Sequence, residues 1–227
     1  IINAFVVKFQ AAFPEMPENE HLTMKLAELL KIQTVVSSLI RLKSGELSYI
    51  TKRIDRTTKG EKIHMLDMFQ ITEAFDKYRS SMEKVGKAVI EHSSHTLLDV
   101  LRLYELVIFT YITGNNDMHL KNFSLILKDE NWGFAPAYDL LNAQLHLSED
   151  KEETALTIGG KKSRLTKSDF IILGVKFGLS EKQIENVFQR FIKAEKKLLL
   201  LIDQSFLREA NKIKYKDLLT QRLHLFK

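Results

Sequence analysis

The spacing of apolar residues predicts strands at the start of the chain. A short β-rich run over residues 4–9 predicts a strand, and leucines three or four positions apart predict a helix over residues 18–31. Two more apolar stretches, residues 35–42 and 46–54, flank Ser44-Gly45 and predict a β-hairpin.

After a polar linker at residues 55–61, the pattern becomes mainly helical. Residues 95–113 are apolar around most of a helical surface, which predicts a buried helix that ends at Gly114. Further helices are predicted within residues 166–227, beginning near Ser168 and Ser180.

These patterns predict an α+β fold in two parts: residues 1–55 with strand, helix and hairpin, and residues 56–227, mainly helical. The 227 residues are 44% hydrophobic and 28% charged, which is typical of a globular protein.

There is no cysteine, so disulfides and Cys-ligated metal sites are excluded and a reducing compartment is favoured. No apolar run approaches the roughly 20 residues that span a bilayer. We expect a cytoplasmic protein that has no signal peptide and does not contact a membrane.

The net charge of +5 suits a phosphate ligand or an acidic partner. The basic residues are scattered along the chain, however, so direct binding to nucleic acid is not expected.

A polar loop after the buried helix contains the most informative residues. Asp117 and Asn122 have the D-x-x-x-x-N spacing of the protein-kinase catalytic loop. In that loop the aspartate takes up or orients the proton of the substrate hydroxyl, and the asparagine holds a magnesium ion. The phosphate charges also require a second carboxylate at the metals.

A predicted hairpin brings that carboxylate into range. Residues 123–127 and 134–138 predict two antiparallel strands, and a four-residue tip at 129–132 pairs Asn122 with Asp139. Directly opposed residues have Cβ atoms about 5 Å apart, so both side chains could bind one metal. A register shift of one residue would place them on opposite faces.

The D-x-x-x-x-N spacing also has a structural interpretation, because short motifs recur by chance. Asp117 and Asn122 could make local turn bonds, and Asp139 could cap a helix that begins at Leu140. The buried helix, the hairpin and a lysine in the first strand together favour the kinase interpretation.

That lysine is Lys8, which lies in an otherwise apolar strand resembling the V-A-I-K strand of kinases. A charge there needs a partner, and a phosphate together with a helix carboxylate would supply one. Glu20 is the candidate carboxylate, with Glu28 as the second choice. The alternative is a lysine on an edge strand that points to solvent.

Residues 116–124 (NDMHLKNFS) and 136–141 (PAYDLL) resemble the catalytic and metal-binding signature of HipA-like serine/threonine kinases. Residues 49–56 resemble that family's hinge between two lobes, and residues 19–30 resemble its first N-lobe helix. The resemblance covers nearly the whole chain. It implies a protein-kinase-like fold with a partial, β-containing N-lobe and a mainly helical C-lobe.

The resemblance also implies a role for each matching residue. It makes Asp117 the catalytic base, Asn122 and Asp139 the magnesium ligands, and Lys8 the phosphate-binding lysine. The residues expected against the rest of ATP are His119, Lys121 and Tyr138 at the phosphates, the Lys52 and Ile54 backbones at adenine, and Asp55 at the ribose.

The implied function is that of an ATP- and Mg2+-dependent serine/threonine protein kinase, the toxin of a toxin–antitoxin module. The implied partners are a DNA-binding antitoxin and a protein substrate connected with translation. The sequence contains no Gly-rich or Ser-containing phosphate loop. We therefore expect an upstream segment, or a separate chain, to supply the N-terminal subdomain. An inactive nucleotide-binding subunit, or one that depends on a split partner, is the alternative function, and a small-molecule kinase of related fold is a third.

Overall fold

The computed structural model describes residues 5–8, 13–146 and 149–227. Its first sheet contains three antiparallel strands in the order β1-β3-β2. These strands are β1 (Phe5–Lys8), β2 (Ser37–Arg41) and β3 (Leu47–Lys52). Lys8 is paired with Tyr49 of the central strand. The predicted strand and hairpin are thus present, although Ala4 and Phe9 lie outside the described residues.

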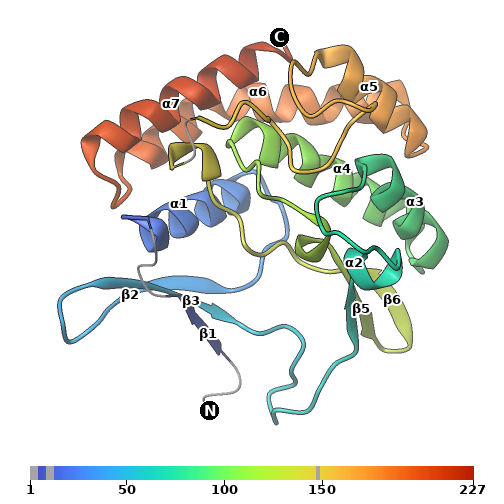
Figure 1. Ribbon diagram of the computed structural model, residues 1–227, viewed down its shortest axis with the longest axis horizontal. Helices are drawn as coiled ribbons and strands as arrows, with labels where there is room; N and C mark the ends of the chain where they lie inside the picture. Colours follow the sequence, from blue (N-terminus) through green and yellow to red (C-terminus); the bar gives the residue numbers. More distant parts are fainter. Residues whose placement is uncertain (1–4, 9–12, 147–148) are drawn as a thin grey trace.

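Helix α1 (Met16–Leu29) packs against β2, β3 and α6, so it connects the first sheet to the helical part (Figure 1). Pro17 lies in its first turn, where a missing N–H costs nothing. Its buried face includes Leu22 and Leu26, as the leucine spacing predicts, and also the polar residue Glu20.

The second sheet has the order β4-β5-β6 and contains β4 (Met65–Asp67), β5 (Ser124–Lys128) and β6 (Asn131–Phe134). Its hairpin pairs Lys128 with Asn131, so the tip has two residues, Asp129 and Glu130. Both have positive φ, 47° and 62°, as a type I′ turn requires. The predicted four-residue tip is therefore wrong by two residues. A shift of two residues keeps each side chain on its predicted face of the strand.

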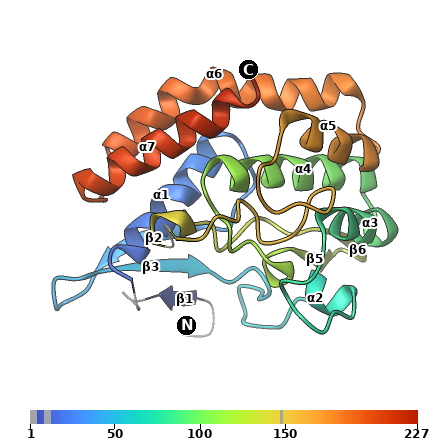
Figure 2. The same ribbon diagram turned by 45° about the horizontal axis from the view of Figure 1, so that its top comes forward.

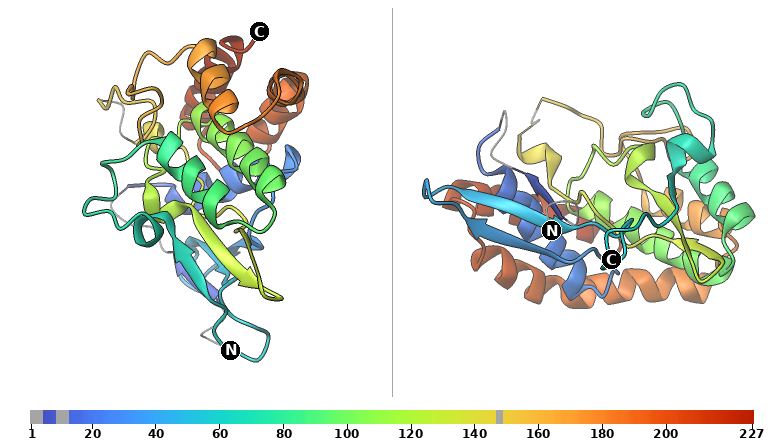
Figure 3. Two further views of the ribbon diagram at one scale, coloured as in Figure 1. Left: turned by 90° about the vertical axis from the view of Figure 1, so that its right-hand side faces the viewer. Right: turned by 90° about the horizontal axis from the view of Figure 1, so that it is seen from below.

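The helical part extends to the C-terminus, and its last helices (orange and red) lie above both sheets in the left view of Figure 3. It contains α2 (Met68–Ile71), α3 (Met82–His92), α4 (Thr96–Ile112), α5 (Lys167–Lys176), α6 (Glu181–Asp203) and α7 (Glu209–His224). Helix α4 packs against α3 and α7, and α7 runs alongside α6 (Figure 2). Leu103, Phe109 and Ile112 of α4 are fully buried, which confirms the predicted central helix.

Helix boundaries follow local capping. Helix α4 is followed by Gly114 at φ 75°, a conformation that favours glycine. Helix α6 begins after the predicted Ser180, whose hydroxyl accepts the Gln183 N–H. Helix α5 begins one residue before the predicted Ser168, because Thr166 caps it and exchanges hydrogen bonds with Asp169.

The two sheets and the helical layer confirm the predicted α+β class. The boundary at residue 55 stays a prediction. Within the part of the chain that the structure describes, no helix has the length and apolar character needed to cross a membrane.

Candidate active site

A cleft of about 610 Å³ lies between the two sheets and contains nearly all of the predicted site residues. They come from β1, α1, the end of β3 and the segment after it, the loop before β5 and the segment after β6. The predicted residues that line it are Lys8, Glu20, Lys52, Ile54, Asp55, His119, Lys121, Asn122, Tyr138 and Asp139. Asp117 does not line this cleft.

Lys8 lies between two carboxylates. Its Nζ is 2.8 Å from Glu20 Oε1, and it also forms an ion pair with Asp139 Oδ1. Burial opposes the charge of Lys8, but Glu20 and Asp139 more than offset this, so the pKa of the ammonium is raised. The predicted pairing with Glu20 is present, whereas Glu28 pairs with Lys25 at the surface.

Glu20 is only 5% exposed. Burial raises the pKa of its carboxyl to about 7, against the opposing charge of Lys8. A carboxyl with this pKa changes protonation near neutral pH, so the charge around Lys8 depends on pH in that range.

Asn122 and Asp139 are in contact, with 2.5 Å between Asn122 Nδ2 and Asp139 Oδ2. Asn122 ends a short 3-10 turn (Leu120–Asn122), and Asp139 has a left-handed φ of 59°. Burial alone would raise the pKa of the Asp139 carboxyl, but Lys8 and Asn122 outweigh it and the pKa is lowered. The predicted proximity therefore exists, although these residues are not partners in a continuous ladder.

Tyr138 and Lys121 are linked through the backbone. The Tyr138 hydroxyl donates to the Lys121 carbonyl at 2.9 Å and lies 2.6 Å from Ser124 Oγ. Burial raises the pKa of Tyr138 to about 12, so this hydroxyl stays protonated. The Lys121 ammonium lies 4.8 Å from the Phe69 ring centroid, a cation–π contact.

His119 is 8% exposed, and its Nε2 lies 2.9 Å from Lys77 Nζ. Burial and the charge of Lys77 lower its pKa, and Asp117 and Asp139 oppose this only in part. The imidazole is therefore neutral at neutral pH, with Nε2 as the acceptor for Lys77. His119 Nδ1 is buried and has no hydrogen-bond partner among the described residues.

Asp117 receives a hydrogen bond of 2.8 Å from the Tyr78 hydroxyl to its Oδ1. Lys77 and Tyr78 thus contact two residues of the loop, and neither contact was predicted from the sequence. They lie between two helices in a segment without a recognisable motif.

The segment after β3 offers a backbone edge to the cleft. The Lys52 N–H donates to the Val36 carbonyl at 2.8 Å, whereas the Ile54 N–H has no acceptor among the described residues. Asp55 is held by Arg53 through Nε at 2.8 Å and by Arg56 through Nη1 at 2.6 Å. Hydrogen bonding from Arg53 lowers the pKa of the Asp55 carboxyl. The residue predicted to bind the ribose is therefore an ionised carboxylate that is already paired with two arginines.

Residues 3–198 match the family model of the HipA-like C-terminal domain. The chain belongs to this family. A Haemophilus influenzae protein named "Putative kinase" is 24% identical to it over 225 residues, covering 86% of this chain and 66% of the relative. "Putative kinase Y4dM" of Sinorhizobium fredii is 31% identical over 222 residues, covering 86% and 53%. The chain therefore spans less than two thirds of the length of these curated relatives.

Two solved structures share the fold of this HipA-like chain. The HipA toxin of Shewanella oneidensis, in complex with HipB and operator DNA, has a TM-score of 0.84 at 18% identity, covering 97% of this chain and 58% of that protein. The Helicobacter pylori proinflammatory kinase CtkA has a TM-score of 0.69 at 16% identity, covering 97% and 86%. The predicted kinase-like fold is thus confirmed.

The HipA-like cleft suits a magnesium ion bound to phosphates. Among the described residues, no group of three or more His, Cys, Asp and Glu side chains has a metal-binding arrangement. Among the described residues, however, Asn122 Oδ1 is buried and has no hydrogen-bond partner, and the same side chain contacts the Asp139 carboxylate through Nδ2. These are hard oxygen donors, and a nucleotide-bound Mg2+ takes only one or two protein ligands.

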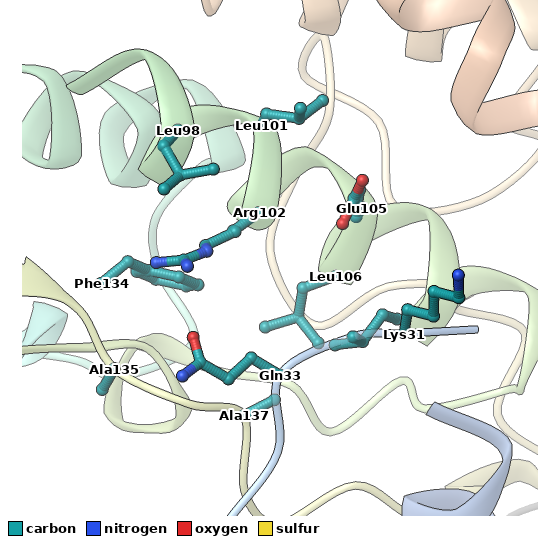
Figure 4. A pocket seen from close by; sticks show the side chains of 11 residues that line it. Lys31, Gln33, Leu98, Leu101, Arg102, Glu105, Leu106, Phe134, Ala135 and Ala137 are labelled. Carbon is teal, nitrogen blue, oxygen red and sulfur yellow. The ribbon is translucent and has the colours of Figure 1, made fainter. Parts of the chain in front are cut away.

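A second pocket, of about 260 Å³, lies between the loop after α1, helix α4 and β6 (Figure 4). Arg102 points toward Phe134 in this view and is paired with Asp99 at 3.1 Å. Glu105 is paired with Arg190 at 2.9 Å. None of the predicted site residues lines this pocket. The predicted site residues therefore belong to the larger cleft and not to this pocket.

Proposed function

We propose that this chain is the catalytic part of an ATP-dependent serine/threonine protein kinase of HipA type. The observation that carries the proposal is the contact of Lys8 with Glu20 and Asp139, together with the contact of Asp139 with Asn122. The phosphates of Mg-ATP require a protonated lysine and oxygen ligands for the metal. Lys8, whose pKa is raised, and the neighbouring side chains of Asp139 and Asn122 suit these requirements. The membership in a kinase-like family supports the same activity.

In this proposal each residue of the cleft has a defined task. Lys8 binds phosphate oxygens, and Glu20 orients its ammonium. The neutral His119 faces the phosphates with Lys121. The backbones of Lys52 and Ile54 bond the adenine edge, and the Asp55 carboxylate reaches the ribose.

Asn122 and Asp139 would hold the magnesium ion, which neutralises phosphate charge when bound. Asp117 accepts the proton of the protein hydroxyl as that oxygen bonds to the γ-phosphorus, and the bond from this phosphorus to the bridging oxygen breaks so that ADP leaves.

We further propose that the protein is the toxin of a toxin–antitoxin pair whose antitoxin binds DNA and whose target is connected with translation. The support is the fold shared with a HipA that was solved with HipB and operator DNA. The cytoplasmic location also remains part of this proposal.

Phosphoryl transfer from labelled Mg-ATP to protein serine or threonine tests the activity. The wild type is expected to transfer, and Asp117→Asn is expected to lose transfer by about 10³-fold or more while it keeps its fold and ATP binding. Undiminished transfer by Asp117→Asn would refute the role of Asp117. Transfer to a small metabolite alone would favour a small-molecule kinase.

An inactive nucleotide-binding subunit is the second candidate. It is favoured by the engagement of the Asp55 carboxylate with two arginines. ATP binding without any transfer, in this chain and in its full-length protein, would support this candidate.

A further inference from the structure

Residues 76–78 form a turn that lies directly against the loop containing Asp117. The Leu120 N–H donates to the Lys77 carbonyl at 3.1 Å, and Lys77 Nζ reaches His119 Nε2 at 2.9 Å. The Tyr78 hydroxyl donates to Asp117 Oδ1 at 2.8 Å. One backbone bond and two side-chain bonds therefore attach the turn to the loop.

The turn is also fixed from within and from its far end. The Tyr78 N–H donates to Asp76 Oδ1 at 2.8 Å, which closes an Asx turn. Beyond it, the Ser80 carbonyl accepts the Thr157 N–H at 3.1 Å, and the Thr157 carbonyl accepts the Met82 N–H at 2.9 Å. The position of Tyr78 is thus determined independently of its contact with Asp117.

The ring of Tyr78 is held as well, although the residue is 39% exposed. It meets the His119 imidazole edge-on, with centroids 5.1 Å apart and an interplanar angle of 81°. Lys77 Nζ lies 4.8 Å from the centre of the same ring. Because these two contacts fix the orientation of the Tyr78 ring, its hydroxyl points toward the Asp117 carboxylate.

We propose that Tyr78 is a positioning residue of the phosphoryl-transfer site, which holds the Asp117 carboxylate by Oδ1 and leaves Oδ2 for the hydroxyl of the protein substrate. This inference rests on the proposed function. Among the described residues, Asp117 Oδ2 accepts no hydrogen bond, so it is available for that proton.

The physical reason is preorganisation. A partly exposed aspartate rotates about two side-chain bonds, and only a few of its orientations put an oxygen on the incoming hydroxyl. Burial and the bond to Asp117 raise the pKa of Tyr78 to about 12, so the hydroxyl donates throughout the neutral range. The bond therefore fixes one carboxylate orientation before the substrate arrives.

The test compares Tyr78→Phe with the wild type in steady-state transfer from Mg-ATP to protein serine, over a range of ATP concentrations. This substitution keeps the ring and removes only the hydroxyl. We expect kcat to fall by about 10- to 100-fold, while KM for ATP and the calorimetric Kd stay within about twofold. In the Asp117→Asn background the same change is expected to cause no further loss, because Tyr78 acts through Asp117.

Tyr104→Phe is the matched control. It also removes one tyrosine hydroxyl, but that hydroxyl bonds the Phe170 carbonyl at 3.1 Å within the helical layer. We expect a lowered melting temperature and an unchanged kcat, the reverse of the effects of Tyr78→Phe.

Three outcomes overturn the inference while the wild type remains active: an unchanged kcat in Tyr78→Phe, an increased kcat/KM for the protein substrate, or a loss of kcat that parallels a loss of thermal stability. An increased kcat/KM would mean that the Tyr78 hydroxyl occupies the position that the substrate hydroxyl needs. If the wild type transfers no phosphate, the proposed function fails instead, and this inference fails with it.

Discussion

Replacing Glu20 with glutamine removes a buried carboxyl from the cleft and leaves an amide of nearly the same shape. Glu20 is 5% exposed and has Lys8 as its partner at 2.8 Å. The amide can still accept a hydrogen bond from Lys8, so the main change is the loss of a group that titrates near neutral pH.

The magnitude follows from the pKa of this carboxyl, which burial raises from about 4.5 to about 7. At pH values between these, the folded chain retains a proton that the unfolded chain has released. The contribution of Glu20 to stability is therefore present below pH 4.5 and is lost as the pH rises through 7. A shift of this size corresponds to a loss of about 3 kcal/mol in the free energy of unfolding.

Urea denaturation of the wild type and Glu20→Gln, at intervals between pH 4.5 and pH 8, measures this loss. We expect the stability of the variant relative to the wild type to rise by about 2–3 kcal/mol over that interval. Glu28→Gln is the control, because Glu28 belongs to an exposed pair with Lys25 on the same helix, and its difference is expected to stay within about 0.5 kcal/mol. A pH-independent difference for Glu20→Gln, or a difference of opposite sign, would refute this explanation.

Three other substitutions give further tests. Gly86→Ala places a Cβ 2.1 Å from the Phe177 ring, so we expect urea denaturation to show a free energy of unfolding lower by about 1–3 kcal/mol. An unchanged free energy of unfolding would contradict this prediction. Asn19→Ala removes two bonds of 2.9 Å to the Asn142 backbone, and we expect calorimetric melting to report a loss of about 2–4 kcal/mol; a loss under 1 kcal/mol would contradict the importance of this link. Lys8→Met is expected to weaken Mg-ATP binding at least about tenfold in a fluorescence titration, and unaltered affinity would remove Lys8 from the phosphate site.

The sequence was most informative where a local pattern of residues has one structural consequence. The apolar surface of residues 95–113 requires burial, and the helix formed there is the buried α4. Lys8 in an otherwise apolar strand favoured a nearby carboxylate partner, and Glu20 is that partner. The proximity of Asn122 and Asp139 was predicted too, but from a hairpin register that is two residues off, so the contact does not arise from the predicted pairing.

The parts that were missed depend on backbone conformations that side chains do not signal. Asp129 and Glu130 adopt positive φ without a glycine, which shortens the hairpin tip to two residues. Asp139 has positive φ as well, and this conformation turns its carboxylate toward Asn122 and Lys8.

The contact of Tyr78 with Asp117 joins segments 39 positions apart. It depends on how the segment between α2 and α3 folds back onto the loop. No periodic pattern or motif in that segment carries this information.

The most direct test of the central claim is a calorimetric titration of Mg-ATP into the wild type and into Asp139→Asn. The proposed site predicts magnesium-dependent binding by the wild type that the substitution weakens at least about tenfold, because the carboxylate beside Lys8 and Asn122 is lost. Equal affinity in the two proteins, or binding that does not depend on magnesium, would contradict the assignment of this cleft as the site of phosphoryl transfer.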